Sequence, residues 1–591
     1  MTVMRAMRAG ALRRGVALYG FVPPRRGASL HPQTTGTDVR AAAATARGPA
    51  MASPAPDAPP RTQHATAGPL DLSDTASVYA RTSTGDLVRA LVVLCACQIK
   101  PLVQHADWLL SMAQRVFGGG LVDFVLKHSF YAHFCAGEDE KAIRPRIEAL
   151  QGHGVGSILD YAAEADEHAS PQRSQSPIQV DVARKYHYEG EAACDAHVDV
   201  FLRCIETVHG VSPGGFAAIK LTALGPPALL KRMSTAIEEV RTLFHKFDAT
   251  SDGVLTTDEF INGYRKFFVE TRLGDAFDDQ FGLEGLLHSL DPHKTGHIDY
   301  VEWSNQLQLE HLPVLTRRCR GTGPLSESVL QDWEMQALVD MSKRIDVLAC
   351  RASDLGVRLM VDAEQTYFQP AIDNTVFGLQ EKYNARTLPS GDPGKITVFN
   401  TYQLYLKDAM ARLVDDLRRA ERKGYFFGAK LVRGAYMVSE RQRAEDLGYP
   451  SPIHDTLEDT HAAYDEAIKI LLDSIAGGEA TEFMVASHNQ DSVQATLGHM
   501  HDLGLPPGCG VHFGQLLGMA DHVTFSLGAE GHDVHKYVPY GHVGEVVPYL
   551  LRRAQENSAV LGTATTEIGM MQTEIARRFS SGFGTGMAPS R

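Results

Sequence analysis

From about residue 150 onward, short apolar and β-branched runs alternate with longer stretches of amphipathic, helical spacing. This alternation is typical of a parallel α/β sheet, because each connection between parallel strands needs room for a helix. The runs predicted as strands lie at residues 156–161, 216–222, 358–362, 398–402, 428–433, 483–487, 510–515 and 535–540. Most of these runs end in polar or ionisable residues, and chemistry at strand carboxyl ends is typical of a (β/α)8 barrel. We therefore predict an α/β barrel.

Two stretches depart from this rhythm. Residues 71–149 place apolar side chains at helical spacing and predict a helical N-terminal unit. The second and third predicted strands are separated by about 135 residues instead of one helix, which predicts an insertion at 236–312. The barrel then occupies residues 150–235 and 313–575, and residues 576–591 are expected to form a flexible tail.

The N-terminus has a distinct composition. Its first 47 residues contain eight arginines, no lysine and one acidic residue, Asp38. This composition is typical of a transit peptide, with the mitochondrion as the first destination and the plastid as the second. A merely disordered tail rich in Arg and Ala is the alternative. Residues 1–70 are therefore assigned to a transit peptide and a linker rich in Pro and Ala.

Overall composition narrows the classes of partner. The net charge is −14, so the chain lacks the basic character of a nucleic-acid-binding protein. The eight cysteines form no CxxC or zinc-type cluster and are interpreted as reduced thiols. No apolar run approaches the roughly 20 residues that a membrane-spanning helix needs.

The predicted insertion contains a twelve-residue stretch, 248–259 (DATSDGVLTTDE), that matches a calcium-binding loop. Calcium needs oxygen ligands around a sharp turn, which the glycine at position 6 permits, and the final Glu can bind through both oxygens. The candidate metal residues of this first loop are Asp248, Thr250, Asp252, Leu255 and Glu259. The helical flanks make the insertion EF-hand-like and α-helical.

A second loop of the same length follows at residues 291–302 (DPHKTGHIDYVE). Its candidate metal residues are Asp291, Asp299 and Glu302, but it departs from the calcium-loop pattern at positions 3 and 5, His293 and Thr295, and Lys294 adds positive charge. We predict that the first loop binds Ca²⁺ and that the second binds it weakly or not at all. Alternatively, both loops are relics of the fold that pack without metal.

Near the C-terminus, Tyr549, Arg552, Arg553 and Glu556 follow the i, i+3, i+4, i+7 spacing of one helical face. Two adjacent guanidinium groups make a clamp for a carboxylate. Taken alone, such a pair is more often part of a solvated helix surface.

Several motifs accompany this pair, in a fixed order along the chain. They are IKLTALG (219–225), VDAEQTY (361–367), NTYQLYLKDA (400–409), KLVRGAY (430–436), ASHN (486–489), FGQLLGM (513–519) and KYVPYG (536–541). Together they resemble proline dehydrogenase over residues 150–562. The paired calcium-type loops also resemble those of some animal members of this family, the eukaryotic mitochondrial type.

The resemblance implies a distorted TIM-type (β/α)8 barrel that binds FAD noncovalently at its strand carboxyl ends. It implies oxidation of L-proline to Δ1-pyrroline-5-carboxylate, with electrons passed to a membrane quinone. The expected location is then the matrix side of the mitochondrial inner membrane, with peripheral membrane contact.

The resemblance also implies roles for individual residues. Arg552 and Arg553 would bind the substrate carboxylate, with Lys220 on its opposite side. Asp362 would pair with Lys220 or the flavin edge, and Glu556 would orient an arginine. Tyr549 and Leu516 would pack against the substrate ring. Flavin contacts would come from Asn400, Gln403, Lys430, Val432, Gly434, Ala435, Ser487, His488 and Asn489.

Three positions depart from relatives of the family. Lys430 and Met437 stand where bacterial members have an arginine and a tryptophan. Tyr537 stands where hydroxyproline-selective relatives have a small serine, so its bulk favours proline by about 1–3 kcal/mol. Hydroxyproline dehydrogenase is the alternative enzyme, and a catalytically silent calcium-binding barrel protein is the alternative from another class.

Overall fold

In the computed structural model of the chain, the described residues are 70, 74–161, 190–270, 280–387, 394–559 and 561–583. The chain divides into two compact units, residues 1–61 and 62–591, and every described residue belongs to the second unit. The predicted transit peptide and nearly all of the linker lie outside the described residues.

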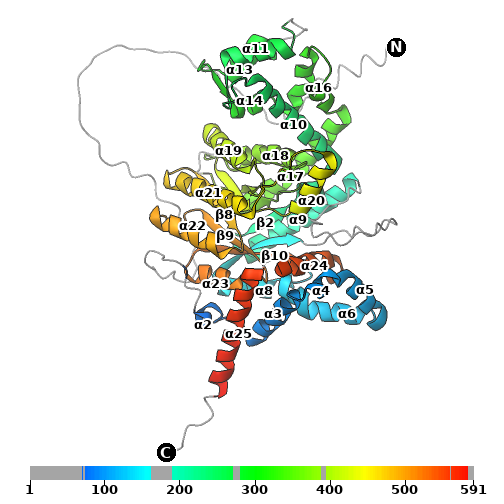
Figure 1. Cartoon of the computed structure of the whole chain (residues 1–591), viewed down its shortest axis with the longest axis vertical. Helices are drawn as coiled ribbons and strands as arrows, with labels where there is room; N and C mark the ends of the chain where they lie inside the picture. The colour runs from blue at the N-terminus through cyan, green and yellow to red at the C-terminus, as the bar shows by residue number, and fades with distance from the viewer. Residues whose placement is uncertain are drawn as a thin grey trace, which may run out of the picture. The chain divides into compact units, whose positions relative to one another are not determined.

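Eight parallel strands close into a barrel, which confirms the predicted fold (Figure 1). Each strand pairs with its neighbours along the chain, and the barrel closes where the first and last strands pair, with Val155 opposite Val534. The strands are β1 (Val155–Tyr161), β2 (Phe216–Ile219), β5 (Arg358–Val361), β6 (Val398–Gln403), β7 (Phe427–Val432), β8 (Thr481–Ala486), β9 (Val511–Leu516) and β10 (Asp533–Tyr540). Each overlaps one predicted strand.

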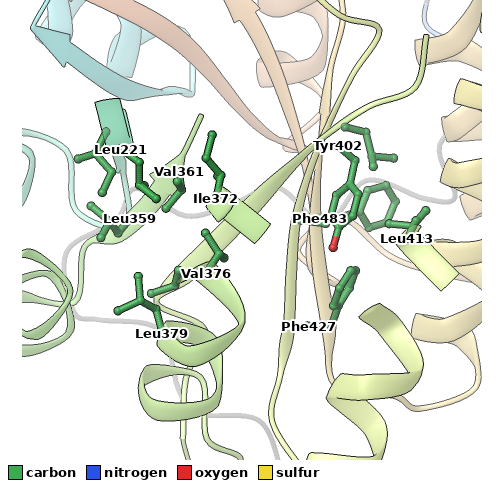
Figure 2. Packing of buried hydrophobic residues seen from close by; sticks show 14 of the residues in the cluster. Leu221, Leu359, Val361, Ile372, Val376, Leu379, Tyr402, Leu413, Phe427 and Phe483 are labelled. Carbon is green, nitrogen blue, oxygen red and sulfur yellow. The ribbon is translucent and has the colours of Figure 1, made fainter. Parts of the chain in front are cut away.

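Alternating side chains on the strands fill two different cores. Ile158, Phe216, Met360, Phe399 and Met484 form a cluster inside the barrel. Outward-facing side chains instead pack against the surrounding helices, and Figure 2 shows two such groups. These groups are Leu221, Leu359, Val361, Ile372, Val376 and Leu379 on one side, and Tyr402, Leu413, Phe427 and Phe483 on the other. Complete burial of an apolar side chain of this size contributes about 1.5–3 kcal/mol.

Helices follow the strands as the barrel topology requires. They are α9 (Glu191–Val211), α10 (Pro227–Phe247), α17 (Asp332–Leu355), α18 (Gln369–Tyr383), α19 (Ala409–Lys423), α20 (Met437–Leu447), α21 (Leu457–Ala476), α22 (Gln490–Asp502), α23 (Asp521–Ala529), α24 (Val543–Ala559) and α25 (Leu561–Phe583). Helix α25 continues past residue 575, where a flexible tail was predicted. Arg577 and Arg578 both pair with the buried Glu574, and Arg578 also donates to the Tyr79 carbonyl at 2.7 Å, so the helix extends to Phe583.

The N-terminal unit is helical, as predicted. Its elements are α2 (Thr75–Val78), α3 (Thr84–Cys97), α4 (Lys100–Gln104), α5 (Ala106–Phe117), α6 (Gly119–Leu126), the π-helix η1 (Lys127–Tyr131), α7 (Ala132–Phe134) and α8 (Arg144–Gly152). Figure 1 shows α3 and α4 beside α24. The contact is apolar, because Val93, Cys97 and Val103 share a cluster with Val546 and Leu550 of α24.

The insertion contains two helix–loop–helix units joined by a short antiparallel pair. Strand β3 (Val254–Thr256) in the first loop pairs with β4 (His297–Asp299) in the second, with Leu255 opposite Ile298. Its helices are α11 (Thr257–Phe267), α13 (Leu283–Leu290), α14 (Tyr300–Gln306), α15 (Leu312–Leu315) and α16 (Pro324–Ser328), with 3-10 turns η4 (Leu309–His311) and η5 (Thr316–Arg318). Helix α10 crosses the boundary predicted at 235/236, so one helix serves both the barrel and the insertion.

No helix among the described residues is both long and apolar enough to span a membrane.

Candidate active site

Most predicted site residues gather at the carboxyl ends of the barrel strands. Lys220 follows β2, Asp362 follows β5, and Ser487 and His488 follow β8. Gln403, Val432 and Leu516 are the last residues of their strands, and Lys430 and Tyr537 lie within β7 and β10. Because parallel strands end at the same rim of a barrel, residues far apart in sequence become neighbours there.

The Asp362 carboxylate contacts two side chains from different strands, Lys430 of β7 and Tyr537 of β10. Lys430 Nζ lies 2.5 Å from its Oδ1, and the Tyr537 hydroxyl donates to its Oδ2 at 3.3 Å. The ion pair is largely removed from solvent, with side-chain exposures of 14% for Asp362 and 9% for Lys430. The structure therefore pairs Asp362 with Lys430, and a contact with Lys220 or the flavin edge stays a prediction.

Glu364 is an ionisable residue of the rim that sequence reasoning missed, although it lies inside the VDAEQTY motif. Its carboxylate is buried and accepts from the Thr222 hydroxyl at 2.8 Å and the Thr222 N–H at 3.2 Å. Burial raises the pKa of Glu364, and the nearby Lys220 ammonium opposes that rise. Lys220 therefore lies near the buried Glu364, which follows Asp362 by two positions in the sequence.

Helix α24 presents the predicted arginine face. Arg553 Nη2 forms an ion pair with Glu556 Oε1 at 2.5 Å, and its guanidinium carbon lies 5.0 Å from the centre of the Tyr549 ring. Tyr549 is buried in a cluster against which Leu516 packs. Its hydroxyl has no hydrogen-bond partner within the part of the chain that the structure describes. The predicted contact between Glu556 and an arginine is present.

His488 connects the strand ends to this helix. Its Nε2 accepts the Leu516 N–H at 3.0 Å. Burial, with the nearby positive charges of Lys536 and Arg553, lowers the pKa of His488 to about 3. The ring is therefore neutral at physiological pH, and its one proton lies on Nδ1.

Gln403, Gly434 and Ala435 form a second part of the rim. Gln403 donates to the Glu364 carbonyl at 2.8 Å, and its Oε1 accepts the Ala435 N–H at 3.4 Å. Gly434 has φ of +143°, and a Cβ there would lie 2.4 Å from the Tyr405 ring. Only glycine is compatible with this close approach.

Arg433, which was not among the predicted site residues, fixes Ser487. It donates to Ser487 Oγ at 2.8 Å, to Ser492 Oγ at 2.9 Å and to His461 Nδ1 at 2.9 Å. Asn489 accepts the Ser492 N–H at 3.0 Å and caps α22, so its side chain already has a structural role.

Asn400, predicted as a flavin contact, has a structural partner on α18. Its side-chain amide donates to Asp373 Oδ1 of α18 at 2.9 Å and is fully buried. Neighbouring side chains of β6 alternate, with Phe399 inside the barrel and Tyr402 in the outer core. The Asn400 side chain therefore points away from the barrel interior.

The first calcium-type loop directs its carboxylates at its own backbone. Asp248 accepts the Gly253 N–H at 2.9 Å, and Glu259 accepts the Thr256 and Thr250 N–H groups at 2.9 and 3.1 Å. The bond from the Thr256 backbone is the main cause that lowers the pKa of Glu259 to about 2. Thr250 donates its hydroxyl to Asp248 at 3.4 Å, and Asp252 accepts the Val254 N–H at 2.9 Å.

Leu255 cannot supply a metal ligand from its side chain, because that side chain is a hydrocarbon; it is fully buried opposite Ile298. The backbone ligand expected at position 7 belongs to Val254. Over the described ranges, no group of three or more His, Cys, Asp or Glu side chains is placed to hold a metal ion.

The second loop contacts the barrel. Arg422 of α19 donates to both oxygens of Asp299, at 2.9 and 2.5 Å, and also pairs with Glu302. Asp291 accepts the Gly296 N–H at 2.8 Å, as Asp248 does in the first loop. No pattern in the sequence indicated Arg422, because it lies 120 residues beyond Glu302.

The chain is similar to several known proteins. The sequence profile of the family described as proline dehydrogenase matches residues 143–566. The human mitochondrial proline dehydrogenase 1 is 37% identical over 558 residues, which cover 87% of this chain and 90% of that protein. The Caenorhabditis elegans mitochondrial proline dehydrogenase 1 is 37% identical over 567 residues, covering 87% and 89%.

A hydroxyproline dehydrogenase from Bos taurus is 32% identical over 514 residues, covering 86% of this chain and 93% of that protein. Among solved structures, proline utilization A from Bdellovibrio bacteriovorus, inactivated by N-propargylglycine, has a TM-score of 0.48 and 15% identity. That match covers 82% of this chain and 38% of the solved chain, so the present chain spans less than half the length of that protein.

Proposed function

The chain belongs to the proline dehydrogenase family and oxidises proline, and on this premise we propose that the strand-end rim and α24 together form its active site. The proposed reaction converts L-proline to Δ1-pyrroline-5-carboxylate. The observation that carries the assignment is the pair Arg552 and Arg553 on the helix whose Tyr549 packs with Leu516 of β9.

Arg552 and Arg553 bind the substrate carboxylate in this proposal. Guanidinium forks match a carboxylate in shape and charge. Glu556 and the Tyr549 ring restrain Arg553 before substrate arrives, so less side-chain freedom is lost on binding. Lys220 supplies a further positive charge at the rim.

The substrate ring packs against Tyr549 and Leu516, with Tyr537 as a third wall. The Tyr537 hydroxyl donates to Asp362, which fixes the phenol in place. Its bulk disfavours a substrate with an added hydroxyl by about 1–3 kcal/mol. The preferred substrate is therefore proline, with hydroxyproline oxidised more slowly.

Proline dehydrogenases use FAD, and the residues present fit a noncovalently bound flavin. Gly434 leaves no room for a side chain, and the side chains around it supply donors from Gln403, Lys430, Ser487 and Arg433. Val432, Ala435 and the neutral His488 complete the residues that would hold it. The bound flavin supplies the acceptor for the hydride that leaves proline. The Asp362 carboxylate holds the position of Lys430 Nζ at this rim.

Several relatives are named as mitochondrial, and we place this chain on the matrix side of the inner membrane with a membrane quinone as electron acceptor. The outer face of the N-terminal helices supports a peripheral membrane contact. Helix α5 buries none of its residues, and its Trp108 and Phe117 are 62% and 66% exposed. Further exposed apolar residues are Val92, Ile99, Met112, Val116, Leu121, Phe124 and Val125.

Binding to phosphatidylcholine vesicles that contain cardiolipin tests this membrane contact. Trp108→Glu should weaken co-sedimentation about tenfold, because a charge replaces an apolar anchor. Trp333→Glu is the matched control, since Trp333 of α17 is also 62% exposed. Equal binding by both variants would exclude α5 as the contact surface.

For the insertion we propose that the first loop binds one Ca²⁺ through Asp248, Asp252, Glu259, Thr250 and the Val254 carbonyl. Glycine at position 6 and a terminal Glu at position 12 support this assignment. Glu259 would have to exchange its backbone hydrogen bonds for the ion.

Anaerobic titration of the purified flavoprotein with L-proline tests the proposed function. Flavin absorbance should bleach with proline at lower concentrations than with hydroxyproline. A protein that contains flavin but is not bleached by proline would contradict the assignment of the site.

A further inference from the structure

The two calcium-type loops differ in what neutralises their carboxylates. In the first loop, Asp248 and Glu259 accept hydrogen bonds from backbone N–H groups of the same loop. In the second loop, Asp291 and Asp299 also accept backbone N–H groups, but Asp299 and Glu302 additionally receive a guanidinium from the barrel, that of Arg422. Asp299 and Glu302 occupy positions 9 and 12 of the loop, where calcium ligands are expected.

The contact between Arg422 and Asp299 is bidentate. Arg422 Nη1 lies 2.9 Å from Oδ1 and Nη2 lies 2.5 Å from Oδ2, while Nη1 also pairs with Glu302. A bidentate arginine is the strongest of the ordinary charge-assisted contacts to a carboxylate.

A second contact one turn earlier on α19 reinforces this one. Arg419 donates to Asn305 Oδ1 at 2.5 Å and to Ser304 Oγ at 3.0 Å, and both partners lie on α14 directly after the second loop. The Arg419 side chain is only 7% exposed. Helix α19 therefore contacts the second loop and its exiting helix through two arginines.

We propose that Arg422 is the resident cation of the second loop, where it excludes a divalent ion from Asp299 and Glu302 and fastens the insertion to the barrel. The part of this proposal that concerns calcium stoichiometry rests on calcium binding by the first loop. Only one ion then binds per chain. The second loop then keeps the insertion attached to α19 of the barrel whether or not calcium is present.

This attachment has a consequence for the barrel. The same helix α19 carries Arg412, which pairs with Asp373 at 2.8 Å, and Asp373 in turn accepts from Asn400 of β6 at 2.9 Å. Helix α19 is thus fixed at one end by the insertion and near its other end by a buried network on a barrel strand.

Calorimetric titration of the full-length flavoprotein with CaCl₂ tests the proposal, using Arg422→Gln and Lys423→Gln. Lys423 is the matched control, because it is the next residue of α19 but pairs with Glu381 of α18 within the barrel. Wild type and Lys423→Gln should bind one ion per chain. Arg422→Gln should bind a second, weaker ion that the added change Asp299→Asn removes, and its melting temperature should fall further than that of Lys423→Gln.

Two results would overturn the proposal. One is a wild-type protein that binds two ions and loses one on Asp299→Asn. The other is an Arg422→Gln protein that gains no ion. If wild type binds no ion while Arg422→Gln gains one at the second loop, the first-loop assignment fails and the role of Arg422 stands. Asp252→Asn identifies the first loop, since it should remove only the wild-type ion.

Discussion

The barrel rim and the second loop of the insertion each bring acidic and basic groups together from distant segments, but the two clusters have different roles. At the rim, Asp362 and Lys430 are 14% and 9% exposed, and they lie among residues assigned to flavin and substrate. At the loop, Asp299, Glu302 and Arg422 are 21%, 35% and 40% exposed and join two elements of the fold. Both clusters consist of acidic and basic side chains, but the rim pair is more deeply buried than the loop cluster.

The difference has a physical basis. A charge pair with little access to water interacts strongly, but removing one partner leaves an uncompensated buried charge. A pair that keeps access to water is screened, and its loss costs little. The rim should therefore be sensitive to each substitution in both activity and stability, whereas the loop should affect docking and ion binding.

The largest expected contrast is in proline oxidation. Arg552→Met combined with Arg553→Met should lower kcat/KM for proline about a thousandfold, because about 4 kcal/mol of charge-assisted carboxylate binding is lost. Arg422→Gln should stay within about twofold of wild type. Stopped-flow reduction of the flavin by proline measures both. An unimpaired double variant would place the substrate elsewhere.

A smaller contrast concerns the stability that each carboxylate supplies. Asp362→Asn should destabilise the fold by about 3 kcal/mol, because the Lys430 ammonium is left buried without its counter-ion. Asp299→Asn should cost no more than about 1 kcal/mol, because its surroundings remain hydrated. Urea unfolding of the two variants provides the comparison, and equal losses would show that burial does not distinguish the two sites.

The smallest contrast is in pH dependence. The pKa of His488 is about 3 in the folded protein and near 6.5 when unfolded, so below pH 6.5 only the unfolded chain takes up a proton. Stability should fall as the pH drops from 6.5, by about 2 kcal/mol at pH 5. Asp299, whose pKa is lowered, stays ionised over this range.

Urea unfolding at pH 7 and pH 5 measures this loss, and His488→Gln should show a shallower dependence because it removes the titrating ring. An unchanged slope in that variant would mean that His488 is protonated in the folded protein.

Local pattern was enough to predict the barrel. All eight strands lie where apolar runs predicted them, because strand formation follows side-chain periodicity over a few residues. The same periodicity separates Asn400 from the other predicted flavin contact on β6. Asn400 and Gln403 are three residues apart on one strand and therefore face opposite sides. Leu255 is a similar case, because an apolar residue in a short strand packs and does not bind metal.

Two helices extend across domain boundaries predicted from the sequence, because longer-range contacts set their ends. Helix α25 persists beyond residue 575 because Arg577 and Arg578 meet the buried Glu574, and Arg578 also bonds to the Tyr79 carbonyl. Helix α10 joins the barrel to the insertion because its Phe244 and Phe247 pack against Trp303, over fifty residues away. The composition near each boundary could not predict contacts with the Tyr79 carbonyl or with Trp303.

The sequence by itself determined the eight-stranded barrel, the two loops and the ordered motifs of proline dehydrogenase, since each depends on residues close together along the chain. Tertiary structure alone decided which charges meet. Asp362 pairs with Lys430 across 68 positions, and Arg422 reaches Asp299 across 123. Coulomb attraction depends on distance in space, which barrel closure and helix packing set and local sequence does not.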